Sequence, residues 1–268
     1  MLRISQIFVY PIKSLGGSTL SSAAVTDRGL EHDRRWMLVD RNNRFMTQRE
    51  TPGLALFHTS ITPEGIGITH QSGSYWLLPF DAPPAGTAVV RIWDDLCNAV
   101  LVSPEADAWF SRLLSTDCRL VHMPDSTHRA ADIKRAPGSI TSFSDDYPFL
   151  LLGQASLDDL NSRLQLTVPV NRFRPNIVIE GGQPFEEDGI AKFRTGGIDF
   201  FGVKPCARCS VTTINQDNGR KSREPLATLA TYRTRNNKVY FGQNLVHRGI
   251  GSIRVGDAIE VMERKEAF

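Results

Sequence analysis

The sequence predicts a mainly β protein of the α+β class, in which a few helices cover β-sheets. Short runs of alternating apolar and polar residues recur along the chain, and Gly, Pro, Asn and Asp turns separate them. The chain has 268 residues, of which 41% are hydrophobic, enough for a sizeable core and for about two domains. Only a few segments have the periodicity and capping signals of helices.

The strand-like runs occur in both halves of the chain, and the helix signals lie between them. We expect strands at Ile4–Tyr10, Arg35–Asp40, Val89–Trp93, Asn98–Val102, Ile177–Ile179, Ile198–Val203 and Ser252–Met262. We expect helices at Pro104–Leu114, Ser156–Leu164 and Pro225–Arg233. In the second helix, Ser156 and Asp159 fit a capping box, and Leu157, Leu160 and Leu164 form an apolar stripe. We interpret these stripes as faces that cover a sheet.

A polar, turn-rich segment, Pro124–Asp146, separates the two halves. It contains the basic residues Arg129, Lys134 and Arg135. A loop of this length in a compact domain is usually either functional or disordered, and a lid over a binding site is one role that fits it.

The overall charge excludes several classes of partner. There are 31 Lys and Arg against 29 Asp and Glu, a net charge of +2, so no global field attracts nucleic acid or an anionic membrane.

Pro11 and Lys13 interrupt the apolar stretch near the N-terminus, which argues against a secretory or membrane-spanning segment. We therefore expect a cytoplasmic protein that binds neither nucleic acid nor membrane, with its four cysteines as thiols.

The most reactive stretch is Cys206-Ala207-Arg208-Cys209, because Lys204 and Arg208 place positive charges beside two thiols. A structural zinc site is disfavoured, since the other cysteines are isolated and the six histidines show no paired spacing. A thioredoxin-like dithiol should open a helix, whereas the β-branched run Ser210–Ile214 is strand-like. An ordinary buried pair of cysteines remains an open alternative.

Six stretches, in the same order along the chain, resemble the signatures of MOSC-domain proteins. They are Val9–Ser14, Asp33–Trp36, Ser144–Pro148, Arg172–Asn176, Lys204–Cys209 and Phe241–Asn244. The chain most resembles bacterial enzymes related to the mitochondrial amidoxime-reducing component. This resemblance implies an N-terminal MOSC-associated β-rich domain at residues 1–120, packed against a MOSC β-barrel at residues 121–268.

The resemblance also implies a molybdenum cofactor, in which molybdenum is held by the dithiolene of molybdopterin. Cys209 matches the family's molybdenum ligand and thus the catalytic cysteine, while Cys206 matches a residue with no assigned metal bond. A thiolate suits such a soft centre. Positions that hold the cofactor, including its phosphate, match Lys13, Ser14, Arg34, Asp146, Tyr147, Arg174, Arg208 and Asn244. Asp188 matches an acidic position of the family, and we assign it no role.

The implied reaction is a two-electron reduction of an N-hydroxylated compound, such as an amidoxime, a hydroxylamine or an N-hydroxylated base. The sequence has no dinucleotide fingerprint and no cysteine or histidine set for an iron–sulfur cluster or haem. We therefore expect no haem, iron–sulfur cluster or flavin in this chain, and an external donor of the ferredoxin-like, cytochrome or flavin reductase type. Arg129, Lys134 and Arg135 are candidates for contacting that donor.

Two other functions remain open at this stage. A sulfur carrier would work through a persulfide on Cys206 or Cys209 and would need no metal. A storage protein would bind the molybdenum cofactor through the same basic residues without turning anything over.

Overall fold

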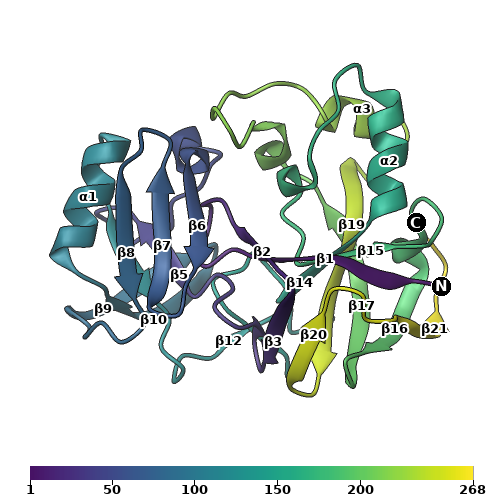
Figure 1. Ribbon diagram of the computed structural model, residues 1–268, viewed down its shortest axis with the longest axis horizontal. Coiled ribbons are helices and arrows are strands. Elements are labelled where there is room, and N and C mark those ends of the chain that lie inside the picture. The colour runs from purple at the N-terminus through teal and green to yellow at the C-terminus, as the bar shows by residue number, and fades with distance from the viewer. Residues whose placement is uncertain (268) are drawn as a thin grey trace.

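A nine-stranded mixed sheet organises the larger of two lobes in the computed structural model, which describes residues 1–267 (Figure 1). All of its ladders are antiparallel except the one between β14 and β15. In order across the sheet, the strands are β2 (Ser18–Leu20), β1 (Arg3–Val9), β15 (Ile177–Glu180), β14 (Phe149–Gly153), β19 (Lys238–Arg248), β17 (Ile198–Ala207), β16 (Ile190–Thr195) and β21 (Glu260–Arg264), and β18 (Thr234–Arg235) pairs with β19.

The expected closed MOSC barrel is wrong for the described residues, because no ladder among residues 1–267 joins the end strands β2 and β21. Within that range, only an isolated bridge, Arg3–Ala258, with backbone hydrogen bonds beside it, links β1 to the segment just before β21. A barrel needs every strand paired on both sides. Here the short strand β2 lies beside the other lobe, where the Ser18 hydroxyl donates to the Thr59 carbonyl, and the Thr59 hydroxyl donates to the Gly16 carbonyl at 2.7 Å. Contacts between the lobes thus occupy the region next to β2. The mainly β class is confirmed.

The smaller lobe consists of two sheets and one long helix (Figure 1). One sheet has the order β5 (Trp36–Val39), β11 (Arg119–His122), β10 (Asp95–Leu101) and β9 (Gly86–Ile92), and the other has β6 (Phe57–Ile61), β7 (Gly65–His70) and β8 (Tyr75–Pro79). Helix α1 (Pro104–Leu114) has the predicted bounds. The Ser103 side chain accepts the Ala106 N–H at 3.0 Å, which caps the helix, and Trp109 and Phe110 are buried.

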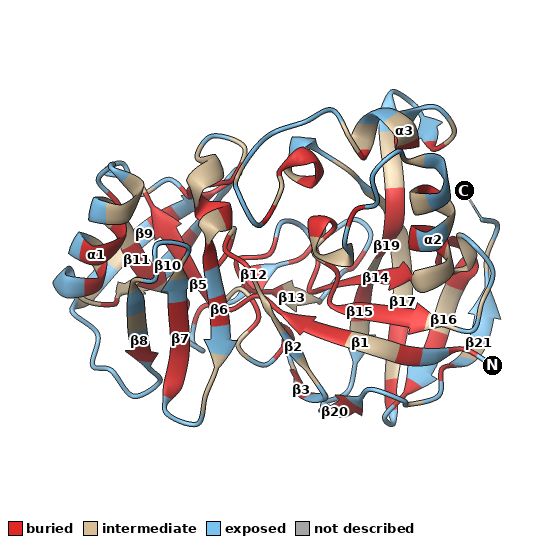
Figure 2. Cartoon of the chain, turned by 45° about the horizontal axis from the view of Figure 1, so that its top comes forward, coloured by how far each residue is buried: buried red, intermediate tan, exposed pale blue. Residues whose placement is uncertain are grey.

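The N-terminal segment belongs to the larger lobe. Strand β1 pairs with β15, far along the chain, and β3 (Ser22–Thr26) lies between β4 (Gly29–Leu30) and β20 (Gly251–Arg254). Figure 2 shows that β1, β14 and β15 are largely buried in the middle of this lobe. The chain therefore begins in the larger lobe and enters the smaller one only after about thirty residues, and the domain boundary near residue 120 stays a prediction.

Two expectations for the larger lobe need correction. Helix α2 (Gln154–Arg163) follows Gly153, and the proposed capping box is wrong: the Ser156 hydroxyl donates to Glu187 Oε2 and accepts the Phe185 N–H, both at 2.7 Å. The predicted strand Ser252–Met262 is interrupted at Gly256, whose φ of +95° favours a turn, so β20 and β21 are separate.

The remaining elements are short. Helix α3 (Leu226–Ala230) is shorter than predicted, and both α2 and α3 pack on the larger lobe (Figure 1). The 3-10 helices are η1 (Pro52–Leu56), η2 (Val170–Arg172), η3 (Glu186–Gly189) and η4 (Ser210–Thr213), and the strands β12 (Arg129–Ala130) and β13 (Ile140–Thr141) form a ribbon. Asp188 is buried in an ion pair with Arg233. Among residues 1–267, every helix falls short of the length and hydropathy that a bilayer crossing requires.

His122 on β11 should make folding stability depend on pH. Its ring packs against Trp36 at 4.6 Å, and burial, with a smaller effect of Arg35, lowers its pKa from 6.5 to about 4. Between these values the unfolded chain binds more protons, so the free energy of unfolding should fall as the pH falls from 6.5 to 4. In urea unfolding across this range, His122→Phe should lose less stability than wild type. Parallel losses would contradict this assignment.

Candidate active site

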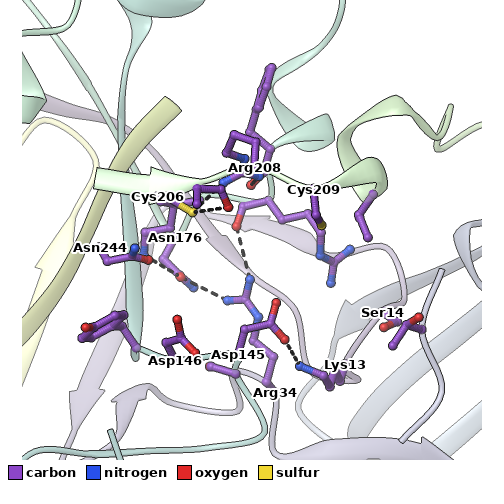
Figure 3. Close-up of a pocket in the computed structure, with 18 of the residues that line it drawn as sticks. Lys13, Ser14, Arg34, Asp145, Asp146, Asn176, Cys206, Arg208, Cys209 and Asn244 are labelled. Carbon is purple, nitrogen blue, oxygen red and sulfur yellow. Dashed lines mark hydrogen bonds and ion pairs between the residues drawn. The ribbon is translucent and has the colours of Figure 1, made fainter. Parts of the chain in front are cut away.

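All nine residues that the sequence predicted for the site line one pocket between the two lobes (Figure 3). They come from the loops that follow β1, precede β5, β14 and β15 and follow β17, and from β19 itself. The wall consists of Lys13, Ser14, Arg34, Thr47, Gln48, Arg49, Ser144, Asp145, Asp146, Tyr147, Phe149, Leu150, Phe173, Arg174, Asn176, Cys206, Ala207, Arg208, Cys209, Val211 and Asn244. The individual roles of the nine residues stay predictions.

Three of these residues have an unusual backbone. Ser14, Arg34 and Arg174 have φ values of +70°, +49° and +55°, in the left-handed region that non-glycine residues adopt only a few per cent of the time. Each such residue costs on the order of 1 kcal/mol. Their concentration in one pocket indicates that the fold accepts this cost to aim particular side chains, which is typical of functional sites.

Arg34 is held by three acceptors. Its Nη1 donates to Asp33 Oδ2 at 2.6 Å and to Asn176 Oδ1 at 3.0 Å, and its Nη2 donates to the Arg174 carbonyl at 3.2 Å (Figure 3). Asn176 is itself buried and donates to the Phe8 carbonyl, so β1 and the segment before β15 position this guanidinium together.

Arg174 has spare hydrogen-bonding capacity. Its Nη1 donates to the Leu15 carbonyl at 2.6 Å, whereas its Nη2 is buried without a hydrogen-bond partner among residues 1–267. Burial, and then the charge of Arg34, lower its pKa to about 10, so it remains charged at neutral pH. A buried donor without an acceptor costs about 1–3 kcal/mol, and an anionic ligand would remove that cost.

Tyr10 contacts both of these arginines. The guanidinium carbon of Arg34 is 4.5 Å from the ring centroid of Tyr10, and that of Arg174 is 4.3 Å away. The ring is only 1% exposed, and burial raises the pKa of Tyr10 to about 12, which keeps the phenol neutral. Each contact is within cation–π range, so one aromatic ring helps to orient both guanidiniums.

Lys13 and Asp145 form an ion pair in the same pocket, beside Arg34 (Figure 3). Lys13 Nζ lies 2.6 Å from Asp145 Oδ1 and 2.8 Å from the Phe143 carbonyl (Figure 3). Burial lowers the pKa of Lys13, and Asp145 opposes that shift. Desolvation acts to raise the pKa of Asp145, but the charge and hydrogen bond of Lys13 outweigh it and hold that carboxyl well below its usual pKa. Asp145 is therefore ionised at neutral pH.

The segment Pro124–Asp146 is a fixed wall, and the lid interpretation receives no support. Arg129 is buried, pairs with Asp95 at 2.8 Å, and donates to the carbonyls of Ser144 at 2.6 Å and Asp145 at 2.8 Å. The prediction that Arg129 contacts a partner is wrong, because its charge is used inside the protein. Lys134 and Arg135 are exposed and remain candidates.

The two cysteines of the reactive stretch differ in their surroundings. Cys209 is exposed, which contradicts the buried-pair alternative for that residue. Cys206 is partly buried, and Arg208 donates from Nη1 to its sulfur at 3.0 Å and from Nη2 to the Phe173 carbonyl at 2.7 Å. Arg49 places Nη1 3.9 Å from the Cys209 sulfur. Each thiol therefore has a guanidinium beside it.

The residues that follow Cys209 are not the strand that the sequence predicts. Ser210–Thr213 forms η4, in which the hydroxyls of Thr212 and Thr213 donate to carbonyls three residues earlier. Such local hydrogen bonds stabilise turns and compete with strand pairing. Within residues 1–267, no group of three or more His, Cys, Asp or Glu side chains is arranged to hold a metal. Any metal at Cys209 would need its other ligands from a cofactor.

Asp146 and Asn244 lie on one side of the pocket (Figure 3), and Tyr147 also lines it. Lys204 Nζ lies 3.3 Å from Asp146 Oδ2, which offsets the negative charge that would repel a phosphate. The Tyr147 hydroxyl donates to Asp132 Oδ2 at 2.8 Å, so Tyr147 presents mainly its ring. The ion pair with Lys204 therefore makes Asp146 less repulsive to an anionic ligand than an unpaired carboxylate would be.

Sequence reasoning missed several residues of the wall. Gln48 donates to the Ser14 carbonyl at 2.7 Å and exchanges amide hydrogen bonds with Gln216 at 3.0 Å, which joins loops of the two lobes. Asp145 and Asn176 lay within stretches that already carried the family resemblance. Thr47, Gln48 and Arg49 had no such signal, because only the fold brings them to Cys209.

Comparison with known proteins agrees with this geometry. The model of the MOSC N-terminal beta barrel domain matches residues 1–117, and that of the MOSC domain matches residues 139–260. The mitochondrial amidoxime-reducing component 1 of Homo sapiens is 36% identical over 97% of this chain and 82% of its own length. The chain belongs to the MOSC-domain family of these amidoxime-reducing components.

Two further relatives define the breadth of this family. Mitochondrial amidoxime-reducing component 1 of Mus musculus is 33% identical over 97% of this chain and 82% of its own length. Molybdenum cofactor sulfurase of Solanum lycopersicum is 32% identical over 89% of this chain, but the match spans only 32% of that longer protein. Membership in the MOSC family supports association with the molybdenum cofactor and an enzymatic role.

The pocket suits a molybdenum cofactor on structural grounds. Its wall has five Lys or Arg side chains against two carboxylates, a balance that favours an anion such as a phosphate. Arg174 offers a buried, unused donor, and Cys209 offers an accessible sulfur. A soft metal and an anionic tail are the two chemical features that this set matches.

Removing the Tyr10 ring should loosen both arginines. Tyr10→Leu loses two cation–π contacts of about 0.5–1 kcal/mol each, so cofactor retention during dialysis should fall roughly 5- to 30-fold. Tyr10→Phe keeps the ring and should stay within about twofold of wild type. Molybdenum and pterin content, followed over time, provides the measurement. Equal losses in both variants, with unchanged thermal unfolding, would show that the ring has no such role.

Proposed function

We propose that this protein reduces N-hydroxylated compounds at a molybdenum cofactor, with electrons from a separate donor protein. The observation that carries the proposal is the exposed Cys209 sulfur in a pocket of five cations. The 36% identity to the human amidoxime-reducing component supports the choice of substrate class. We retain the cytoplasm as the expected location.

The residues of the pocket would divide the work of binding. Cys209 would be the protein ligand of molybdenum, and Lys13, Ser14, Arg34 and Arg174 would bind the phosphate. The other predicted residues, Asp146, Tyr147, Arg208 and Asn244, would contact the pterin. When bound, the cofactor supplies a centre that can pass two electrons to a substrate.

The reaction balances with two electrons and two protons. The N–O bond breaks, the hydroxyl oxygen leaves as water, and an amidoxime becomes an amidine or a hydroxylamine becomes an amine. Within this chain, Arg49 Nη1, 3.9 Å from the Cys209 sulfur, can donate a hydrogen bond to an oxygen bound nearby. The ion pair of Lys13 and Asp145 keeps that wall polar. Arg49 would orient the substrate and stabilise its departing oxygen, whereas Lys13 would serve the phosphate.

A sulfur carrier is the second candidate, because a molybdenum cofactor sulfurase is 32% identical over 89% of this chain. Arg208, 3.0 Å from the Cys206 sulfur, would stabilise a persulfide anion there. A storage protein is the third, since the cation set alone would bind the cofactor. Metal content together with turnover separates the three candidates.

Substitution of the two cysteines should have unequal effects. Cys209→Ala should abolish both molybdenum retention and the reduction of a model amidoxime, because the metal loses its only protein ligand. Cys206→Ala should keep a substantial part of both. Molybdenum analysis and viologen-driven assays measure this directly. Equal loss in both variants, or a persulfide on Cys206 in protein that binds no molybdenum, would favour the sulfur carrier.

The electron source should show in the kinetics. NADH or NADPH alone should give no turnover, whereas reduced viologen, or a flavin reductase with an iron–sulfur or cytochrome partner, should restore it. Turnover with a protein donor should fall as salt rises, and Lys134→Glu with Arg135→Glu should weaken it several-fold, since both side chains are exposed. Viologen-driven turnover in the same double variant is the control. Activity with NADH alone would contradict the proposal of a separate donor.

A further inference from the structure

Trp93 occupies a position that its side chain does not favour. It stands in the two-residue turn between β9 and β10 with a φ of +53°, where Asn or Gly is the usual choice. It is also 43% exposed, although tryptophan is mostly buried in proteins. A bulky residue in the left-handed region on an exposed turn is an outlier, and such outliers cluster at functional sites.

The turn holds the indole beside the proposed active site. Trp93 Nε1 donates to Asp145 Oδ1 at 3.3 Å, and the ring of Phe45 is 5.0 Å away. The guanidinium of Arg49 lies 4.5 Å from the indole centroid. Asp145 and Arg49 both line the pocket, and Trp93, just outside the lining residues, contacts both of them; we call this edge the rim.

Arg49 connects this rim to the reactive sulfur. Its Nη1 is 3.9 Å from Cys209 Sγ, and its carbonyl accepts a hydrogen bond from Lys221 Nζ at 2.7 Å, which fixes the loop. Any molecule that reaches Cys209 past this rim meets Trp93 and Arg49. The Asp145 side chain is 63% exposed and keeps acceptor capacity beyond its contacts with Lys13 and Trp93.

We propose that Trp93, Arg49 and Asp145 form a substrate subsite that selects planar aromatic N-hydroxylated compounds over small aliphatic ones. The exposed indole contacts the aromatic ring, Arg49 donates to the oxygen of the N–OH group, and Asp145 accepts from the amino group of an amidoxime. An indole makes a large contact with a flat aromatic ring and only a small contact with a methyl group. The inference rests on the proposed reductase function and names the substrate class that this function prefers.

The test compares benzamidoxime with acetamidoxime, which share the reacting group and differ in the ring. The molybdenum-loaded protein is measured as wild type, Trp93→Ala and Trp93→Phe. Tyr75→Ala is the matched control, because Tyr75 is also an exposed aromatic residue but lies on β8 in the outer sheet of the smaller lobe. Two readouts are taken: kcat/KM with reduced viologen, and the dissociation constant by calorimetry without a reductant.

Trp93→Ala should lower the preference for benzamidoxime over acetamidoxime about 3- to 10-fold in both readouts, mainly through KM and not kcat. Trp93→Phe should keep most of the preference, and Tyr75→Ala all of it. An unchanged preference in Trp93→Ala, or wild type that binds both compounds equally, would overturn the subsite. Benzamidoxime that binds selectively without being reduced would leave the subsite standing and refute the reductase proposal.

Discussion

Mutual repulsion among five positively charged side chains is the constraint on which the pocket depends. One cavity is lined by Lys13, Arg34, Arg49, Arg174 and Arg208. The side chains of Lys13 and Arg34 are almost shielded from water. Charges of one sign in such a place raise the free energy of the folded state unless each finds a partner. Much of the surrounding structure supplies those partners. Asp33 and Asp145 supply negative charge, the Tyr10 ring contacts two guanidiniums, and backbone carbonyls accept several of the other donors.

The topology follows from the same requirement. Strand β1 is inserted beside β15 in the large sheet, and the chain then turns at Tyr10–Ser14 to face the loop before β15. This places Lys13 of one segment and Arg174 of another in a single cavity. The Gln48–Gln216 amide pair closes the same seam from the smaller lobe. Neither lobe alone contains the whole set, so binding of an anionic cofactor would also join the lobes.

The sequence predicted the mainly β class and helix α1 well, because Ser103, Pro104 and the apolar pair Trp109 and Phe110 are strong local signals. It failed where tertiary contacts decide. Ser156 fits the pattern of a helix cap, but in the structure it lies within α2 and donates a hydrogen bond to Glu187. Thr212 and Thr213 look like a strand, but their hydroxyls bond back to the chain.

The site could likewise be predicted where local sequence signals decide, and not where tertiary contacts decide. The family signatures named the nine pocket residues, since each signature retains a local motif around a ligand position. They could not name Arg49 or Trp93, which reach Cys209 only through loops of the smaller lobe. The polar composition of Pro124–Asp146 also led us to take Arg129 for a surface charge, although it pairs with Asp95 and supports the wall behind Asp145. Burial of a charge is a property of the fold and leaves no local mark in the sequence.

The central claim is that one thiolate, Cys209, anchors molybdenum while the cations hold the rest of the cofactor. X-ray absorption at the molybdenum edge counts the sulfur neighbours of the metal in the loaded protein. The account predicts that Cys209→Ser has one sulfur neighbour fewer than wild type, and that Cys206→Ser has the same number as wild type. The opposite pattern, with the count unchanged in Cys209→Ser and reduced in Cys206→Ser, would contradict it.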